Sequence, residues 1–226
     1  MLTSEFEILC PEFTILDVTL RDGGFSVNFH WKEEEVFTLL STLTSNGVSH
    51  IELGYLGGLP DKHGVSAPGP ASNVSISLIE KISHKFPSIK PILMIHPSAS
   101  EISLPLRQYR DAGLYGVRVV YHKSWRENFL RLMEQVSKCE MFNCTNLALV
   151  SQYAEQHLLK EIEFLAALGP DVIYAADTCS ALAPEHVKRI YKLLLSCCSV
   201  ELGFHGHDFI GLGLANCLAA ANNGAR

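Results

Sequence analysis

Residues 171–208, DVIYAADTCSALAPEHVKRIYKLLLSCCSVELGFHGHD, contain one complete strand–helix–strand unit. Short apolar runs at Asp171–Ala176 and Ser199–His205 predict two strands, and the amphipathic stretch Pro184–Cys197 predicts a helix between them. The strand runs do not alternate cleanly between apolar and polar residues, which is typical of parallel strands covered on both faces. This unit therefore predicts an α/β fold with a parallel sheet.

The same unit recurs along the whole chain, so that seven strands are predicted, each followed by a helix. The predicted strands are Phe13–Leu20, Ser49–Tyr55, Pro91–His96, Leu114–Tyr121, Leu147–Val150, Asp171–Ala176 and Ser199–His205. The predicted helices are Lys32–Ser45, Asn73–Phe86, Glu101–Ala112, Trp125–Cys139, Ala154–Leu168, Pro184–Cys197 and Leu212–Asn222. Units of roughly 30 residues each predict a TIM (β/α)8-type barrel that is truncated after its seventh β–α unit.

An open, doubly wound parallel sheet is the alternative architecture. Such a sheet would bind phosphate at a glycine-rich turn after its first strand. Gly23 and Gly24 stand at that place, but neither a G-x-G-x-x-G nor a G-x-x-x-x-G-K pattern follows. The barrel is therefore the preferred prediction.

The composition fits one globular domain and argues against several classes of protein. The chain has 226 residues, 47% of them apolar, which suffices for one sizeable core, so we expect a single barrel domain over residues 1–226. The net charge is −6 without a cluster of Lys and Arg, which argues against nucleic-acid binding. No apolar run approaches the roughly 18–20 residues of a membrane span, and residues 1–13 lack the basic start of a signal peptide. We expect a cytoplasmic protein that does not bind membranes.

The seven cysteines are odd in number and form no C-x-x-C pair. This pattern disfavours a disulfide framework or a cysteine-rich zinc site, and buried free thiols are expected instead.

Polar groups gather at the carboxyl ends of the predicted strands, which is where (β/α)8 barrels carry out their chemistry. The amino ends of the same strands carry fewer such polar groups. In chain order, the groups are Arg21 and Asp22, Glu52, His96, His122, Asp177 and Thr178, and finally His205, His207 and Asp208.

The pair His205 and His207 is the sharpest chemical signal. Residues two apart on a strand face the same side, about 7 Å apart, so both imidazoles can converge on one cation. The carboxylate of Asp22 would meet them across the barrel mouth. Such mixed nitrogen and oxygen ligands suit Mn²⁺, Mg²⁺, Zn²⁺ or Co²⁺. The alternative is a pair of histidines that make ordinary hydrogen bonds.

Arg21 adjoins Asp22 in a turn with two glycines. Its guanidinium either forms a surface ion pair or, beside a metal, stabilises a developing enolate through its fixed fork of donors.

Two long motifs in this chain resemble the signatures of the DRE-TIM metallolyases, whose domain is the barrel of 3-hydroxy-3-methylglutaryl-CoA lyase and of pyruvate carboxyltransferases. The family also includes 4-hydroxy-2-oxovalerate aldolase, 2-isopropylmalate synthase and homocitrate synthase. The first motif is Ile15–Gly23, and the second is Gly203–Asp208, followed by Gly211–Asn216. Ile51–Gly54 and Ala176–Thr178 are similar to two further strand ends of the family.

The resemblance implies a divalent-metal-dependent carbon–carbon lyase and gives each strand-end residue a role. Such a class II aldolase would cleave a small 4-hydroxy-2-oxo acid to pyruvate and an aldehyde through a metal-bound enolate. The implied metal ligands are Asp22, His205 and His207. Arg21 is implied as the catalytic residue, and the implied substrate-binding residues are Arg21, Glu52, Asp177 and Thr178.

Two departures from the family bear on the reaction. Gly24-Phe25 replaces the Glu-Gln that is usual in the condensing synthases, which favours the aldolase. The alternative is a Claisen-type acyltransferase that condenses acyl-CoA with a 2-oxo acid. The oxovalerate aldolases carry a histidine base at the second of these positions. His30 either replaces that base or is an unrelated loop histidine.

The family continues with an eighth strand and helix, which supply a further metal ligand and which this sequence lacks. An inactive barrel fragment is therefore the alternative of another class. The gap would expose two sheet edges, and we expect a second copy or a partner chain to cover them.

Overall fold

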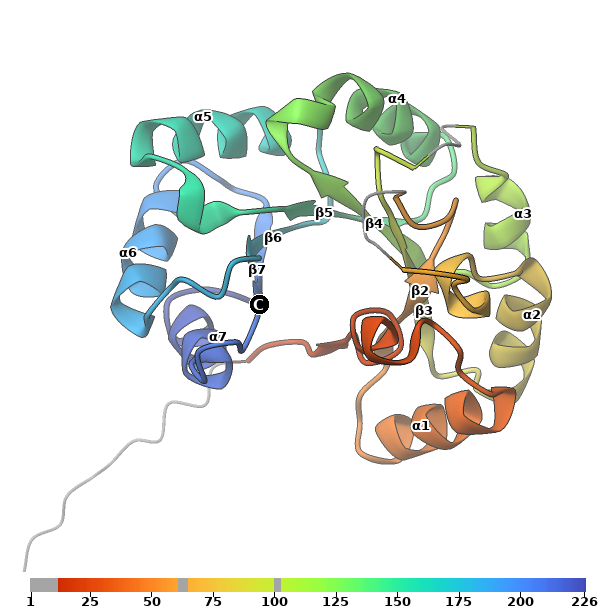
Figure 1. Cartoon of the computed structure of the whole chain (residues 1–226). Coiled ribbons are helices and arrows are strands. Elements are labelled where there is room, and N and C mark those ends of the chain that lie inside the picture. The colour runs from red at the N-terminus through yellow and green to blue at the C-terminus, as the bar shows by residue number, and fades with distance from the viewer. Residues whose placement is uncertain (1–11, 61–64, 100–102) are drawn as a thin grey trace, which may run out of the picture.

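The computed structural model describes residues 12–60, 65–99 and 103–226. These residues form one sheet of seven parallel strands in the order of the sequence, curved into a ring with helices on its outside (Figure 1). The strands are β1 Leu16–Asp17, β2 His50–Tyr55, β3 Lys90–Ile95, β4 Gly116–Tyr121, β5 Phe142–Leu147, β6 Val172–Asp177 and β7 Glu201–Gly206. The predicted α/β barrel-type fold is confirmed.

Each strand leads into the helix that covers it. The helices are α1 Glu33–Ser45, α2 Ile76–Lys85, α3 Leu106–Asp111, α4 Arg126–Ser137, α5 Glu155–Ala166, α6 Pro184–Leu194 and α7 Gly213–Asn222. Short 3-10 turns lie between them at η1 Gly23–Val27, η3 Pro70–Ser72, η4 Lys123–Trp125 and η5 Val150–Gln152. No helix in the described part of the chain is long and apolar enough to cross a membrane.

The ring is open between its first and last strands. Within the described ranges, β1 pairs only with β2 and β7 pairs only with β6. In Figure 1 the ring of helices is interrupted on this side between α7 and α1, where the red segment that contains β1 crosses. This agrees with a barrel that stops after seven β–α units.

The predicted fifth strand was wrong in its position. Leu147–Val150 was predicted, whereas β5 is Phe142–Leu147. Asn143, Thr145 and Asn146 interrupt the apolar pattern, although all three are buried in the sheet. The polar side chains of β5 therefore hid the strand from a search for apolar runs.

The predicted first strand and third helix were too long. β1 ends at Asp17 because the Asp17 carboxylate accepts hydrogen bonds from the Thr19 amide (3.1 Å) and the Thr19 hydroxyl (2.9 Å), which starts a turn. α3 begins at Leu106, directly after Pro105, and residues 103–105 of the predicted helix are not helical; Glu101 lies outside the described residues.

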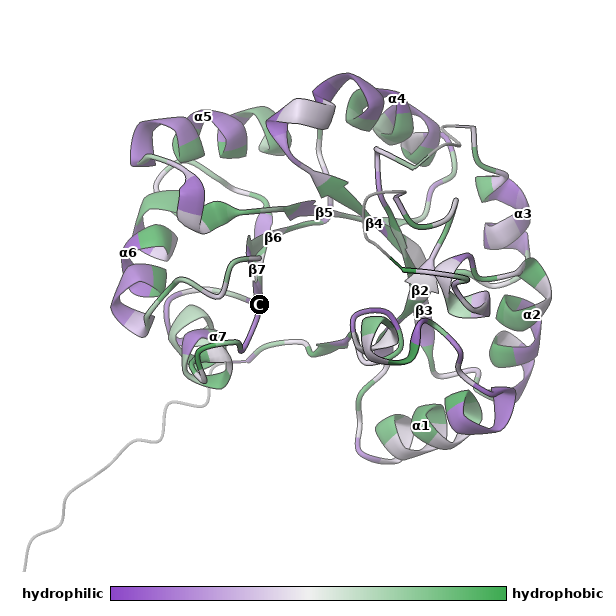
Figure 2. Ribbon diagram, in the orientation of Figure 1, coloured by the Kyte–Doolittle hydropathy of each residue, from purple (hydrophilic) through white to green (hydrophobic). Residues whose placement is uncertain are grey.

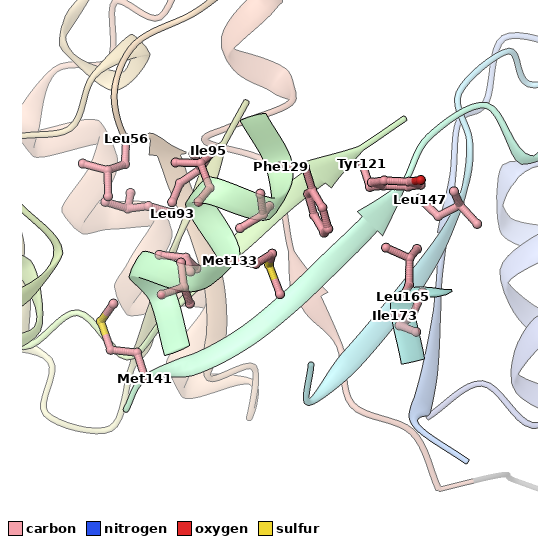
Figure 3. Packing of buried hydrophobic residues seen from close by; sticks show 14 of the residues in the cluster. Leu56, Leu93, Ile95, Tyr121, Phe129, Met133, Met141, Leu147, Leu165 and Ile173 are labelled. Carbon is pink, nitrogen blue, oxygen red and sulfur yellow. The ribbon is translucent and has the colours of Figure 1, made fainter. Parts of the chain in front are cut away.

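The main core lies between the sheet and the helices. The helices turn apolar sides toward the sheet and polar sides outward (Figure 2). Figure 3 shows part of this layer, in which Phe129 and Met133 of α4 share one buried cluster with Ile95, Tyr121 and Leu147 of the strands. The six cysteines that the structure describes are free, as predicted. Cys139, Cys144 and Cys198 are buried as predicted, whereas Cys197 is only partly buried and Cys179 and Cys217 are exposed.

Gly54 sits in a bulge of β2 next to the polar strand ends. The register between β2 and β3 shifts between Glu52 and Gly54, and this irregularity brings both Glu52 and Tyr55 beside Arg21. Gly54 has a φ of +155°, and a Cβ there would lie 2.2 Å from the carbonyl oxygen of Ala71. The close contact leaves room only for glycine.

Gly54→Ala is expected to lower the free energy of unfolding by about 1–3 kcal/mol more than Gly47→Ala does. Gly47 also has a positive φ, +81°, but nothing lies within 4 Å of its Cβ position. The control therefore carries only backbone strain of about 1–2 kcal/mol. Urea unfolding of both variants measures the difference. Equal losses would show that the contact with Ala71 imposes no constraint.

Candidate functional site

Three side chains from opposite ends of the sequence meet at the mouth of the ring. Asp22 follows β1, and His205 and His207 lie at the end of β7. Each offers one ligand atom, and these atoms all lie within 4.8 Å of one another. Asp22, His205 and His207 thus have the spacing that a shared cation requires.

A tight turn presents Arg21 and Asp22 at this mouth. The backbone amide of Asp22 donates to the carbonyl oxygen of Val18 (2.7 Å), and η1 follows at once. A Cβ on Gly24 would lie 2.5 Å from the ring of Phe29. Glycine at this position therefore allows Phe29, which is fully buried, to pack against the turn.

The two imidazoles are held in orientations that suit metal binding. The Nδ1 atom of His207 is 2.9 Å from the backbone carbonyl oxygen of Asp177, so Nδ1 carries the proton and donates it. Its Nε2 atom lies 3.8 Å from Oδ2 of Asp22. A second nitrogen that is anchored in this way is typical of metal-binding histidines.

His205 is kept uncharged. Burial, and then the cationic Arg118 and Arg21, hold the pKa of His205 well below its usual value. The ring is therefore neutral at pH 7, which is the state that binds a metal. With one carboxylate and two imidazoles, the donor set fits a divalent cation of the kinds predicted from the sequence.

Arg21 is buried directly beside this group, with 5% of its surface exposed. Its Nε donates to Glu52 Oε2 (2.5 Å), its Nη1 donates to Asp22 Oδ1 (2.5 Å), and the Tyr55 hydroxyl is a further hydrogen-bond partner. Burial alone would lower the pKa of Arg21, but Glu52, Tyr55 and Asp22 raise it above its usual value. A fixed positive charge therefore adjoins the candidate cation site, and the surface ion pair considered for Arg21 is not what the structure shows.

Glu52 lies beneath the mouth and has 0% of its surface exposed. Both carboxylate oxygens accept hydrogen bonds from arginines: Oε2 from Arg21, and both oxygens from Arg118 at 2.9 and 3.0 Å. Burial alone would raise the pKa of Glu52, but Arg118 and Arg21 hold it below its usual value. This placement argues against the predicted contact with substrate and makes Glu52 an anchor for Arg21.

Asp177 and Thr178 are both bonded to backbone groups. The Asp177 carboxylate is fully buried and accepts from the amides of Ala181 and Leu182, each at 3.0 Å. The exposed Thr178 accepts from the amide of Leu149 (2.9 Å). The Asp177 side chain thus shapes the loop after β6, whereas Thr178 borders the mouth.

The other strand-end histidines are not among the three clustered ligands. His96 and His122 follow β3 and β4, and each Nδ1 accepts the amide of a serine two residues on, at 3.2 and 3.3 Å. His30 is exposed, and its Nε2 lies 3.0 Å from the carbonyl oxygen of Ala67. That bond ties two loops together, which favours the interpretation of His30 as a loop histidine.

Sequence reasoning missed Arg118 and Tyr55. Arg118 is fully buried in the apolar strand β4 and pairs with Glu52. A lone arginine inside the run Gly116–Tyr121 is a signal that could have found it, because a charge in a buried strand needs a partner. Tyr55 offered no such signal, since an aromatic residue is common in any strand.

The sequence matches the HMGL-like protein family over residues 12–226. It is 28% identical over 222 residues to a 4-hydroxy-2-oxovalerate aldolase of Rhodococcus jostii, covering 96% of this chain and 62% of that protein. It is 26% identical over 214 residues to a protein of the same name from Bacillus cereus, covering 93% and 61%. The chain thus spans about three fifths of the length of these curated relatives.

Solved structures share the fold. The N-terminal domain of a Bacteroides vulgatus protein superposes with a TM-score of 0.81 at 22% identity, covering 94% of this chain and 70% of that one. The carboxyl transferase domain of Rhizobium etli pyruvate carboxylase gives a TM-score of 0.76 at 18% identity, covering 95% and 38%. At such identities the likeness speaks for the barrel-type fold alone.

Proposed function

Because the chain belongs to the HMGL-like family, we propose that it provides the catalytic barrel domain of a divalent-metal-dependent carbon–carbon lyase. The substrate is a small 4-hydroxy-2-oxo acid, which is cleaved to pyruvate and an aldehyde. The observation that carries this proposal is the convergence of Asp22, His205 and His207, whose ligand atoms lie within 4.8 Å of one another, beside the buried cation Arg21. The curated relatives named as 4-hydroxy-2-oxovalerate aldolases support the substrate class.

The side chains have separable tasks in this reaction. Asp22, His205 and His207 would hold the cation, which when bound polarises the oxygens of the 2-oxo acid. Arg21 provides fixed donors beside the place where negative charge develops as the bond between C3 and C4 breaks. Arg21 cannot rearrange freely, because Glu52 and Asp22 hold it from two sides. Thr178 borders the mouth and is the remaining candidate for a contact with substrate.

The cleavage produces a negatively charged enolate, and Arg21 is the residue proposed to stabilise that charge. The C4 hydroxyl gives its proton to water or another base, and its oxygen becomes the carbonyl oxygen of the aldehyde. The C3–C4 bond breaks, and its electron pair passes to the three-carbon fragment as an enolate. Protonation of its C3 then gives pyruvate. A permanently charged guanidinium suits this step, because its attraction for oxygen grows as charge accumulates.

Metal-dependent pyruvate release tests the proposed function. The chain, stripped with a chelator and given back Mn²⁺, Mg²⁺, Zn²⁺ or Co²⁺ in turn, is incubated with 4-hydroxy-2-oxo acids while pyruvate is followed by a coupled assay. Pyruvate release that needs metal and no coenzyme A supports the aldolase. Thiol release from acyl-CoA with a 2-oxo acid would instead identify the Claisen-type acyltransferase, and neither activity would favour the inactive fragment.

An apolar cleft of about 360 Å³ opens where the ring is not closed. Its lining includes Ile15 beside β1 and Leu214 and Leu218 of α7, which are 53%, 75% and 51% exposed. Association of the open edges with a second copy or a partner chain stays a prediction. Sedimentation of the purified chain at a mass above 25.0 kDa would support a second copy, whereas a monomer at micromolar concentration would exclude it.

A further inference from the structure

A buried relay of charges runs from the middle of the sheet to the candidate cation site. Arg118 on β4 donates from Nε to Glu52 Oε1 (2.9 Å) and from Nη2 to Glu52 Oε2 (3.0 Å). Glu52 on β2 in turn accepts from Nε of Arg21 (2.5 Å), and Arg21 donates to Asp22. Two strands and the turn after β1 thus contribute one continuous set of ionic hydrogen bonds.

Arg118 fixes the orientation of the Glu52 carboxylate. Two donors from one planar guanidinium define both the position and the plane of a carboxylate, which a single donor does not. Oε2 is then directed at Nε of Arg21. Arg118 itself is held from another side, because its guanidinium carbon lies 5.0 Å from the ring centroid of Tyr174.

The relay is not well explained as a means of stabilising the folded state. Arg118 and Glu52 are 0% exposed and Arg21 is 5% exposed, so three charges have been removed from water. Replacing a buried ion pair by well-packed apolar residues is often neutral or stabilising. A core built only for stability would not need two arginines around one carboxylate, and the arrangement is better explained by the precise placement of Arg21.

We propose that Arg118 is a positioning residue, which acts through Glu52 to hold Arg21 in its working orientation beside Asp22. This inference rests on the proposed function for its effect on rate, but its structural part does not. Arg118 is not one of the three candidate ligands, and its hydrogen bonds toward Arg21 pass through the Glu52 carboxylate, while its charge also acts on His205. It therefore affects kcat and leaves binding of the 2-oxo acid nearly unchanged.

The kinetic arm of the test uses Arg118→Lys, Arg118→Met and Glu52→Gln. We expect Arg118→Lys to lower kcat for pyruvate release by about 10- to 100-fold with little change in KM, as is typical when an outer partner of a functional residue is lost. Arg118→Met should do the same or more. The double variant Arg118→Lys with Glu52→Gln should be no slower than the slower single variant, because residues on one relay are not additive.

Arg126→Met is the matched control. Arg126 also pairs with a glutamate, Glu161, and also lies over an aromatic ring, Phe164, at 4.1 Å from the centroid. It stands outside the relay. Its loss should change the melting temperature and leave kcat unaltered, and an equal loss of kcat in this control would overturn the inference.

The second arm of the test follows Arg21 itself by NMR, and this measurement does not depend on catalytic activity. In ¹⁵N spectra, the Nε–H of Arg21 should exchange slowly with water, and Arg21→Lys assigns its signal. Arg118→Lys and Arg118→Met should each speed that exchange at least 10-fold while the backbone amides of the sheet stay protected. The lysine variant keeps the buried charge, so it covers the case in which Arg118→Met does not fold.

The two arms separate the two hypotheses. If the wild type releases no pyruvate, the proposed function fails, and the exchange of the Arg21 Nε–H still decides the role of Arg118. If pyruvate is released but neither variant at position 118 changes kcat or the exchange, Arg118 is a structural residue and the inference is wrong.

Discussion

Arg21→Ala is expected to lower kcat for metal-dependent pyruvate release by about 100- to 1000-fold, equivalent to about 2.7–4 kcal/mol. The reason is the position of the guanidinium, which is buried, bonded to Glu52 and adjacent to Asp22. If Arg21 stabilises the enolate oxygen, its interaction strengthens as charge develops. The loss should then fall on kcat far more than on KM.

Two further variants separate the roles that Arg21 could have. Arg21→Lys keeps the charge but loses the fork of donors, so it should recover only part of the lost rate. Arg131→Ala removes a surface arginine that pairs with Glu127 on α4 and should leave kcat unchanged. A normal kcat for Arg21→Ala together with a lowered melting temperature would make Arg21 structural and the proposed mechanism wrong.

The barrel-type fold was predictable because the sequence pattern of each β–α unit lies within a short stretch of the chain. Each β–α unit shows in a short run of residues, as in 171–208, and parallel strands covered on both faces leave nearly continuous apolar runs. β5 shows the limit of this reasoning. Asn143, Thr145 and Asn146 are buried in the sheet, and their polar side chains break the apolar run by which such a strand is recognised.

The candidate ligands were predictable for a related reason. All parallel strands present their carboxyl ends at one mouth, so polar residues at those ends must gather whatever their distance in the sequence. The positions of Asp22, His205 and His207 agree with that expectation.

The role of Glu52 could not be predicted in this way. A carboxylate at a strand end can face solvent, a ligand or the interior, and only its neighbours decide which. Here the Glu52 carboxylate forms an ion pair with Arg118, which lies on a strand two places away in the sheet. The bulge at Gly54 adds Tyr55 to the same side. Neither the pairing nor the bulge leaves a pattern within one strand.

The largest effect on ligand binding is expected at His205. His205→Ala removes one of three candidate ligands, so affinity for Mn²⁺ or Zn²⁺ should fall by more than the roughly 10- to 100-fold that is typical of losing an outer-shell partner. Isothermal titration of metal into the stripped chain measures this without any assay of activity. Because the described site offers only three protein ligands, the wild type itself should bind one cation with modest affinity.

His122→Ala is the matched control for that titration, because His122 is also a strand-end histidine but lies outside the cluster of three ligands. It should bind metal as the wild type does, and Asp22→Asn should bind as weakly as His205→Ala. His207→Ala should be equally impaired, since its Nε2 faces Asp22 at 3.8 Å. The decisive comparison is between His205→Ala and the wild type. Equal uptake of metal by these two proteins would remove the cation site, and with it the basis for assigning a metal-dependent lyase reaction to this chain.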